Sequence, residues 1–156
     1  MNDKVTVIGA GRMGYALATA LFQKGFATTV WNRTGAKTEV LSKLGLSVAQ
    51  SVEESVLEAD IVVISLSDYS TTRQLLRHPD IETALRGKTV VQLSSGTPKE
   101  AREMDSWARG CGISYVDGSI LGSPAWIGTP ACTIFYSGPE EVFNRAKPVL
   151  TDGLWR

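Results

Sequence analysis

A glycine-rich turn lies near the N-terminus, where residues 9–14 read GAGRMG and match the pattern GxGxxG. It follows an apolar run at 4–8 and precedes a stretch in which Met13, Leu17 and Leu21 recur at every fourth position, as on one face of a helix. A strand that leads through such a turn into a helix is the context in which this pattern binds a pyrophosphate. The glycines permit the tight turn, the approach of the phosphates and the close packing of the helix. Because N–H groups at the helix start are then free for an anion, we predict a dinucleotide site rather than a turn without a ligand.

A second segment, residues 30–37, reads VWNRTGAK and begins about twenty positions after the turn. Chains that use NAD carry an acidic residue near this place, where it binds the ribose hydroxyl groups and repels a 2′-phosphate. Here the position holds the uncharged Asn32. Arg33 offers a planar set of donors suited to a phosphate, and Thr34 and Lys37 add a hydroxyl and an ammonium group. These residues favour NADPH, and the alternative is a solvated cationic strand end.

The rest of the chain alternates apolar runs of strand length with segments of helical periodicity. Strands are expected at residues 4–8, 28–31, 47–49, 61–66, 89–93, 114–116 and 132–136. Helices are expected at 12–24, 35–44, 52–58, 67–77, from 97 onward and at 139–150, with a loop at 118–130. This alternation predicts a parallel sheet covered on both faces, with right-handed crossovers. We therefore expect one domain over residues 1–156, an α/β, doubly wound, mainly parallel sheet of the Rossmann type, with the strand at 61–66 in a central position.

Three residues are expected to cap helices. Thr34 precedes the helix at 35–44, and Asp68 precedes the helix that begins in LSDY. Thr97 is followed by proline and, three positions later, by Glu100, which predicts a capping box.

The composition argues against several other classes of protein. Sixteen basic residues balance sixteen acidic ones, so no net charge attracts nucleic acid or an anionic membrane, and we expect neither as a partner. The apolar runs are too short to span a bilayer, and the first residues do not resemble a signal peptide. Cys111 and Cys132 form no CxxC motif, and the one histidine, His78, lies in a polar turn. We therefore expect no metal site, and we expect the cysteines to be core thiols of a cytoplasmic protein.

Longer motifs carry a family resemblance. GAGRMG followed by WNRT is similar to the N-terminal domains of the β-hydroxyacid dehydrogenase superfamily, which bind nicotinamide dinucleotides. Further motifs resemble those of the imine reductases and reductive aminases: LSDY at 66–69, LSSGTP at 93–98, YVDG at 115–118, IGTP at 127–130 and YSG at 136–138. The resemblance covers essentially the whole chain. It implies an NADPH-dependent oxidoreductase that acts on a small-molecule imine or carbonyl substrate.

The resemblance also implies which residues hold the cofactor. The pyrophosphate would lie against Gly9, Ala10, Gly11, Arg12, Met13 and Gly14. The adenosine 2′-phosphate would be held by Asn32, Arg33, Thr34 and Lys37. The cofactor would then follow Leu66 and Ser67, and its nicotinamide half would approach Ser94 and Ser95. The loop from Ile120 to Pro130 matches the segment that borders the substrate pocket.

The chain departs from the family pattern in sequence and in length. Gly35 replaces the proline common after WNRT, and residues 122–126, GSPAW, differ from the usual pocket residues. Family members continue into a helical C-terminal domain that completes the active site across a dimer. The resemblance therefore implies a homodimer for the full-length form and a truncated chain that is not active alone. The proton donor of imine reductases, an aspartate or tyrosine of that domain, has no counterpart here, and neither has the catalytic lysine of hydroxyacid dehydrogenases.

Four residues near strand ends could donate a proton, namely Asp68, Tyr69, Tyr115 and Asp117. Asp68 is explained as a helix cap and Tyr115 as a half-buried strand aromatic, while Asp117 can also be a turn or strand-end residue. The catalytic residues are therefore left unassigned, with Asp117 and Tyr69 as candidates.

Apolar residues late in the chain allow two interpretations. Trp126 and Ile127 can form a wall of a substrate pocket or pack against the absent domain, and Leu154 and Trp155 are expected to be exposed without it. Two other functions also stay open: an NADP-dependent β-hydroxyacid dehydrogenase similar to 3-hydroxyisobutyrate dehydrogenase, and a non-catalytic NADPH-binding module. The SSGTP and IGTP motifs favour the imine reductases over the first of these.

Overall fold

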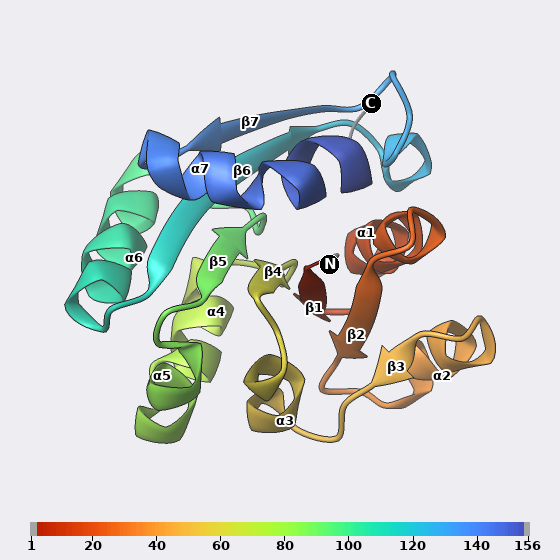
Figure 1. The fold of residues 1–156 in the computed structure, drawn as a ribbon, viewed down its shortest axis with the longest axis horizontal. Helices are drawn as coiled ribbons and strands as arrows, with labels where there is room; N and C mark the ends of the chain where they lie inside the picture. Colours follow the sequence, from red (N-terminus) through yellow and green to blue (C-terminus); the bar gives the residue numbers. More distant parts are fainter. Residues whose placement is uncertain (1–2, 155–156) are drawn as a thin grey trace.

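The computed structural model describes residues 3–154, which form a seven-stranded sheet with helices on both faces (Figure 1). The strand order is β3-β2-β1-β4-β5-β6-β7, so β4 is central as predicted. The strands are β1 (Lys4–Ile8), β2 (Ala27–Trp31), β3 (Ser47–Val48), β4 (Ile61–Ile64), β5 (Thr89–Gln92), β6 (Ser114–Leu121) and β7 (Thr133–Ser137). Neighbouring strands are parallel except for β6 and β7, which are antiparallel. The doubly wound, mainly parallel α/β fold is confirmed.

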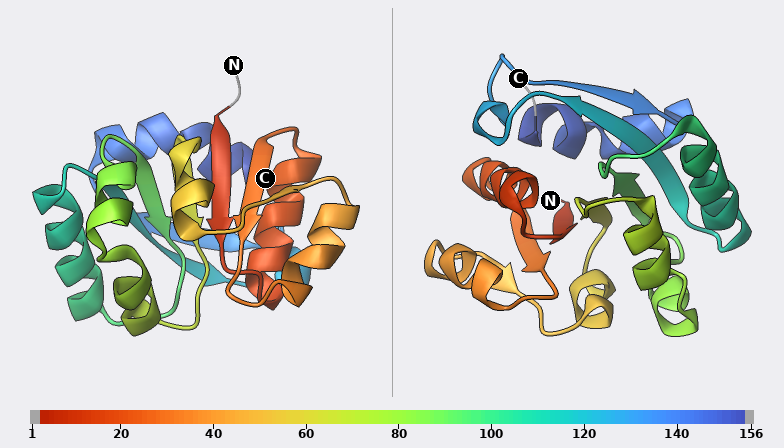
Figure 2. Two further views of the ribbon diagram at one scale, coloured as in Figure 1. Left: turned by 90° about the horizontal axis from the view of Figure 1, so that it is seen from below. Right: turned by 180° about the vertical axis from the view of Figure 1, so that it is seen from behind.

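The helices divide into two layers. They are α1 (Arg12–Gln23), α2 (Ala36–Lys43), α3 (Val52–Leu57), α4 (Tyr69–Leu76), α5 (Pro79–Leu85), α6 (Pro98–Gly110) and α7 (Glu140–Lys147), with a 3-10 turn η1 (Pro124–Trp126) and a π-helical segment η2 (Pro148–Gly153). In Figure 1 and in the turned views of Figure 2, α1 and α7 cover one face of the sheet, and α3 to α6 cover the other.

Alternation along the strands supplies both cores. In β1, Val5 and Val7 belong to the core that includes α1 and α7, whereas Ile8 belongs to the core that includes α3 and α4. Thr6 points to the same side as Ile8, because its hydroxyl donates a hydrogen bond to the carbonyl of Ser55 in α3. Both faces of the sheet are therefore buried, which explains why the central strands are apolar at nearly every position.

Strand β6 extends into the segment predicted to be a loop at 118–130. It continues through Gly118 to Leu121 and pairs with β7, so that Gly118 lies opposite Tyr136. A Cβ atom at position 118 would lie 2.5 Å from Cδ2 of Leu93, so the glycine serves close packing inside a strand rather than a turn. The predicted loop was wrong at residues 118–121 because a glycine in a sequence can indicate either a turn or a closely packed position inside a strand.

The start of α2 also differs from the prediction. Its N-cap is Gly35, no side chain caps it, and Thr34 instead accepts a hydrogen bond from the N–H of Lys37 through its carbonyl at 3.2 Å. The residue that directly precedes α2 is Gly35, which has helical dihedral angles and no side chain that could act as a cap. Thr34 is therefore not a helix cap.

The two other predicted caps are confirmed. Asp68 accepts a hydrogen bond from the N–H of Thr71 at 2.7 Å at the start of α4. Thr97 and Glu100 form a capping box at the start of α6, with the Glu100 carboxylate accepting from the Thr97 N–H at 2.9 Å. These caps fix the loops that lead from β4 and β5 into their helices.

Two further segments were not foreseen. His78 is exposed, as expected, but the turn at that position is the start of α5, with Pro79 at the first helical position. Leu154 is fully buried rather than exposed, because η2 carries the chain back over the core, where the Leu154 carbonyl accepts from the N–H of Gly128 at 3.0 Å. Trp155 lies outside the described residues. Cys132 is buried as expected, whereas Cys111 is only half-buried.

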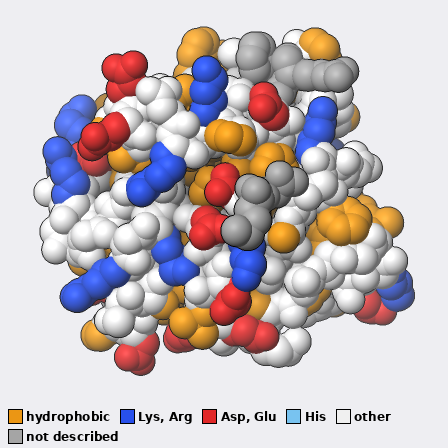
Figure 3. All heavy atoms as spheres, in the orientation of Figure 1, with side chains coloured by type: hydrophobic (Ala, Val, Ile, Leu, Met, Phe, Trp, Pro, Cys, Tyr) orange, Lys and Arg blue, Asp and Glu red, His pale blue; other side chains and the backbone are white. Residues whose placement is uncertain are grey.

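The face of the molecule seen in Figure 3 has no dominant charge. Figure 3 shows Lys and Arg side chains interspersed with Asp and Glu side chains over the visible face. Between residues 3 and 154, no helix combines the length and the hydropathy needed to cross a membrane.

Candidate functional site

The glycine-rich turn connects β1 to α1, and two of its glycines are required by the fold itself. Gly9 has φ of 106°, and a Cβ atom there would lie 2.1 Å from the carbonyl oxygen of Ser65. A Cβ atom at Gly14 would lie 1.9 Å from the carbonyl oxygen of Gly9. The absence of side chains at these two positions lets the start of α1 lie directly against the ends of β1 and β4.

Gly11 is different, because among residues 3–154 no atom outside its immediate chain neighbours lies within 4 Å of the position that its Cβ would take. Its dihedral angles, φ −68° and ψ −177°, are open to any residue. Neither packing nor backbone conformation therefore requires a glycine at this position. The space in front of Gly11 is the room that a pyrophosphate would need.

The start of α1 offers donors without an internal acceptor. No side chain caps the helix, and its first turn contains no acidic residue. The helix itself supplies no acceptor for the N–H groups of Arg12, Met13 and Gly14. These donors and the positive end of the helix dipole point to the same space as Gly11 and suit an anion.

Asn32 connects this turn to the segment after β2. Its Oδ1 accepts a hydrogen bond from the N–H of Ala10 at 2.9 Å, and its Nδ2 donates to the carbonyl of Thr34 at 3.0 Å. One N–H and one lone pair of the amide stay available for a ligand. Asn32 therefore has a structural role that the sequence alone does not reveal.

Three of the residues assigned to the 2′-phosphate, Arg33, Thr34 and Lys37, are exposed beside Asn32. Within residues 3–154, the side chains of Arg33 and Lys37 form no hydrogen bond or ion pair. Arg12, Lys37 and Ile127 are among the residues that line a groove of about 660 Å³ between α1 and η1. Two cations therefore border the groove next to Gly11.

A second cavity, of about 710 Å³, lies at the carboxyl ends of β4, β5 and β6. Ligands of open α/β sheets bind at this edge. The predicted residues Met13, Leu66, Ser94 and Ser95 all line the cavity, whereas Ser67 does not. Ser94 is buried, and its hydroxyl accepts a hydrogen bond from the N–H of Leu66 at 2.9 Å, which leaves Ser95 as the exposed serine of the pair.

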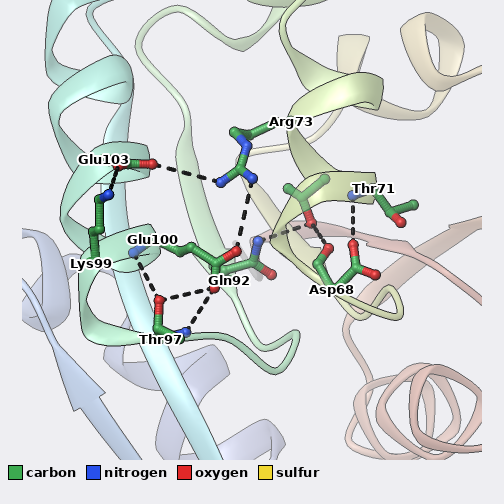
Figure 4. A network of polar contacts seen from close by, with 9 residues as sticks. Asp68, Thr71, Arg73, Gln92, Thr97, Lys99, Glu100 and Glu103 are labelled. Atoms are coloured by element: carbon green, nitrogen blue, oxygen red, sulfur yellow. Dashed lines mark hydrogen bonds and ion pairs between the residues drawn. The ribbon is translucent and has the colours of Figure 1, made fainter.

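A polar network supports the loop after β5 (Figure 4). The Ser94 N–H donates to Oε1 of the buried Gln92 at 2.9 Å, and Gln92 donates through Nε2 to the Thr72 hydroxyl at 3.0 Å. Farther out, the Arg73 guanidinium lies 3.8 Å from a carboxylate oxygen of Glu100, the residue that completes the α6 capping box. The network connects α4, β5 and α6, and so holds the loop that carries Ser94 and Ser95.

The same cavity contains a carboxylate held by two phenols. Oδ2 of Asp117 accepts hydrogen bonds from the hydroxyls of Tyr69 in α4 and of Tyr115, the latter at 3.2 Å. Asp117 lies inside β6, opposite Gln92 and Ser137, and is therefore not a turn residue.

Burial dominates the electrostatics of this cluster. It raises the pKa of the Asp117 carboxyl, although both tyrosine hydroxyls act in the opposite direction. Burial also raises the pKa of Tyr69 and of Tyr115, so both phenols are neutral donors. Tyr115 is 3% exposed rather than half-buried. The spacing of Tyr115 and Asp117, two apart in a strand and therefore on one face, is the sequence signal that could have predicted the pair.

Comparison with known proteins relates this geometry to a family. The family model for the NAD-binding domain of 6-phosphogluconate dehydrogenase matches residues 4–153. The chain belongs to this family of NAD-binding domains. An NADPH-dependent reductive aminase of Aspergillus oryzae is 36% identical over 152 residues, which are 97% of this chain and 51% of the aminase. The chain therefore spans about half the length of the curated relatives that it matches.

Solved structures agree with this assignment. An imine reductase from Myxococcus stipitatus in complex with NADP⁺ is 49% identical with a TM-score of 0.94, over 96% of this chain and 52% of that one. Its V8 variant in complex with NAD⁺ is 45% identical with a TM-score of 0.96, over 98% of this chain and 53% of that one. The resemblance of this NAD-binding domain to the imine reductases and reductive aminases is thereby confirmed.

Proposed function

We propose that this NAD-binding domain binds NADPH and serves an oxidoreductase of the imine reductase type, which reduces the C=N bond of a cyclic imine or iminium ion to an amine. The observation that carries the proposal is the open space in front of Gly11, beside helix N–H groups that have no acceptor in α1. Two glycines of the turn are explained by packing, and the third is explained only by a ligand. The likeness to an NADPH-dependent reductive aminase supports the reaction class.

The free cations after β2 support NADPH rather than NADH. Arg33 and Lys37 are exposed without partners among the described residues, and no acidic side chain stands at position 32. A 2′-phosphate placed beside them would form hydrogen-bonded ion pairs, whereas a neutral ribose hydroxyl can accept a hydrogen bond but brings no opposite charge. Relatives in complex with NADP⁺ and with NAD⁺ both occur, so the preference of this chain rests on these side chains.

The second cavity, at the carboxyl ends of β4, β5 and β6 and called the strand-end cavity from here on, would position the nicotinamide and the substrate. NADPH, once bound, supplies the hydride for the C=N carbon. Leu66, Ser95 and Ile120 line the cavity and would orient the reacting groups, while the Ser94 hydrogen bonds keep the loop after β5 in place. The two candidate residues from the sequence, Tyr69 and Asp117, both line this cavity and stay candidates for a role in the reaction.

A chimera tests the reaction class. The chain would be joined to the C-terminal half of the 49% identical Myxococcus stipitatus imine reductase, and NADPH consumption would be followed with a cyclic imine such as 2-methylpyrroline. We expect reduction of the imine by the chimera and cofactor binding without turnover by the 156-residue chain alone. Oxidation of a 3-hydroxy acid in place of imine reduction would instead support a β-hydroxyacid dehydrogenase. Binding without either reaction would support a non-catalytic module.

Two further features stay predictions from the sequence. The full-length form is expected to be a homodimer, and the protein is expected to act in the cytoplasm. Sedimentation of the chimera and of the 156-residue chain, compared at equal concentration, would test the first expectation.

A further inference from the structure

The strand-end cavity has an unusual distribution of charge. Its lining includes apolar groups, hydroxyls and backbone, and its charged side chains are Arg102 and Asp117. Arg102 is an exposed residue of α6, whereas Asp117 is half-buried in the middle of β6. No ion pair joins these two residues. The carboxylate therefore stands in the wall without a cationic partner among the described residues.

The two oxygens of Asp117 have different environments. Oδ2 accepts from the hydroxyls of both Tyr69 and Tyr115, whereas no group within residues 3–154 donates to Oδ1. Asp117 lines the strand-end cavity and also a smaller one of about 380 Å³, which is bordered by Asp105 and Arg109. The phenols thus fix the direction of the carboxylate and leave one oxygen for a ligand.

We propose that Asp117, oriented by Tyr69 and Tyr115, is the anionic group that binds the positively charged nitrogen of an iminium ion or amine in the strand-end cavity. This inference rests on the proposed function, since it takes the cavity to be the substrate site. A cation beside Oδ1 would offset the cost of burying the carboxylate, and its N–H would fill the acceptor position that no described residue fills. The proposal separates substrates by charge, because a neutral carbonyl compound gains nothing from this oxygen.

The packing around Tyr69 supports a positioning role for this phenol. Its ring lies against Gly96, where a Cβ atom would come within 2.2 Å of Cδ2 of Tyr69. The ring is therefore fixed between the loop after β5 and the body of α4, and its hydroxyl is directed at Asp117. Such a fixed donor keeps the carboxylate from turning towards solvent.

The test uses the 156-residue chain and a simple cationic probe. The ¹⁵N-labelled chain would be titrated with piperidinium chloride, with the amide signals of Ser95, Gly96 and Gly118 followed by NMR. Tetrahydropyran, of similar shape but uncharged, would be titrated in parallel at matched ionic strength. We expect piperidinium to bind at least about tenfold more tightly, the usual gain from a charge-assisted hydrogen bond. Equal affinities of the two probes would overturn the proposal.

Two variants locate the binding group. Asp117→Asn keeps the shape and removes the charge, and it should weaken piperidinium binding about tenfold or more. Asp105→Asn is the matched control, because it removes a carboxylate that borders only the smaller cavity, and it should leave the affinity within about twofold. Loss of binding in Asp105→Asn alone would contradict the proposal. If Asp117→Asn fails to fold, the comparison of the two probes on the unmodified chain still decides the question.

The proposed function is tested separately on the same sample, by calorimetric titration with NADPH. Failure to bind NADPH would remove the proposed function whatever the amine result. NADPH binding together with charge-independent binding of the two probes would remove only the inference on Asp117.

Discussion

The side-chain oxygen of Asn32 accepts a hydrogen bond from the backbone N–H of Ala10 at 2.9 Å. This bond joins the end of β2 to the glycine-rich turn across 22 positions of sequence. The same amide donates to the carbonyl of Thr34, so one side chain sets the distance between the proposed pyrophosphate site and the proposed 2′-phosphate site. Two mutations at this position test the lack of charge and the hydrogen bonds of the amide.

Asn32→Asp tests the charge. The carboxylate can still accept from Ala10, but it adds a negative charge beside Arg33 and loses the donor to Thr34. We expect NADPH to bind roughly tenfold more weakly, with NADH affected less, because only NADPH carries the 2′-phosphate. Fluorescence titration with both cofactors measures the effect. An equal loss for NADPH and NADH would show that charge at position 32 does not select the cofactor.

Asn32→Ala tests the hydrogen bonds. It removes both bonds to the backbone and should lower the free energy of unfolding by about 1–2 kcal/mol. Urea unfolding of the variant and the unmodified chain provides the comparison. Unchanged stability would mean that the bridge from β2 to the turn is not a structural connection.

Gly11→Ala should affect mainly NADPH binding, whereas Gly14→Ala should affect mainly stability. Gly11 faces open space, so its replacement should change stability by no more than about 0.5 kcal/mol while abolishing NADPH binding. Gly14 lies against the Gly9 carbonyl, so its replacement should cost more than about 2 kcal/mol. Thermal unfolding and calorimetry on both variants check this. Undiminished NADPH binding by Gly11→Ala would contradict the proposed location of the pyrophosphate.

Gly96→Ala should displace Tyr69. The added methyl group would overlap the phenol ring, and we expect a loss of roughly 1–3 kcal/mol of stability. Gly110→Ala is the matched control, since that glycine lies in α6 with open space around it and should be neutral or slightly stabilising. A Gly96→Ala variant as stable as the control would mean that the ring can move, and the fixed orientation of Asp117 would be in doubt.

Asp117 and Asp68 should respond to pH with opposite sign. Burial raises the folded-state pKa of Asp117 above its unfolded value of 3.8, so the folded chain holds this proton more tightly and loses stability as pH rises through that window. Hydrogen bonds from Thr71 lower the pKa of Asp68, so its contribution is present above its unfolded pKa and is lost as pH falls. Urea unfolding of Asp117→Asn from pH 3 to pH 8 should therefore show the unmodified chain losing stability relative to the variant as pH rises. A constant difference would contradict the burial argument.

Local features of the fold were predictable from the sequence, and features that depend on distant residues were not. The glycine-rich turn, the Asp68 cap and the Thr97 capping box follow from a few neighbouring residues, and the structure contains all of them. The length of β6 depends on pairing with β7, which a glycine in the strand concealed.

In the candidate site, too, contacts between residues far apart in the sequence could not be predicted. Leu154 is buried because η2 returns to the core, and Asp117 meets Tyr69 across 48 positions of sequence. In the sequence, Asn32 is notable only for its lack of charge, because its two hydrogen bonds depend on the positions of the turn and β2 in the fold. The residue types were therefore recognisable, but their partners required the fold.

We propose above all that the cations after β2 make this domain select NADPH. Calorimetric titration of the chain with NADPH and with NADH, repeated on Arg33→Ala, tests it most directly. We expect NADPH to bind at least about tenfold more tightly than NADH, and Arg33→Ala to remove most of this difference by weakening the binding of NADPH alone. Equal affinities of the unmodified chain for the two cofactors, or an Arg33→Ala variant that binds NADPH as tightly as before, would contradict it.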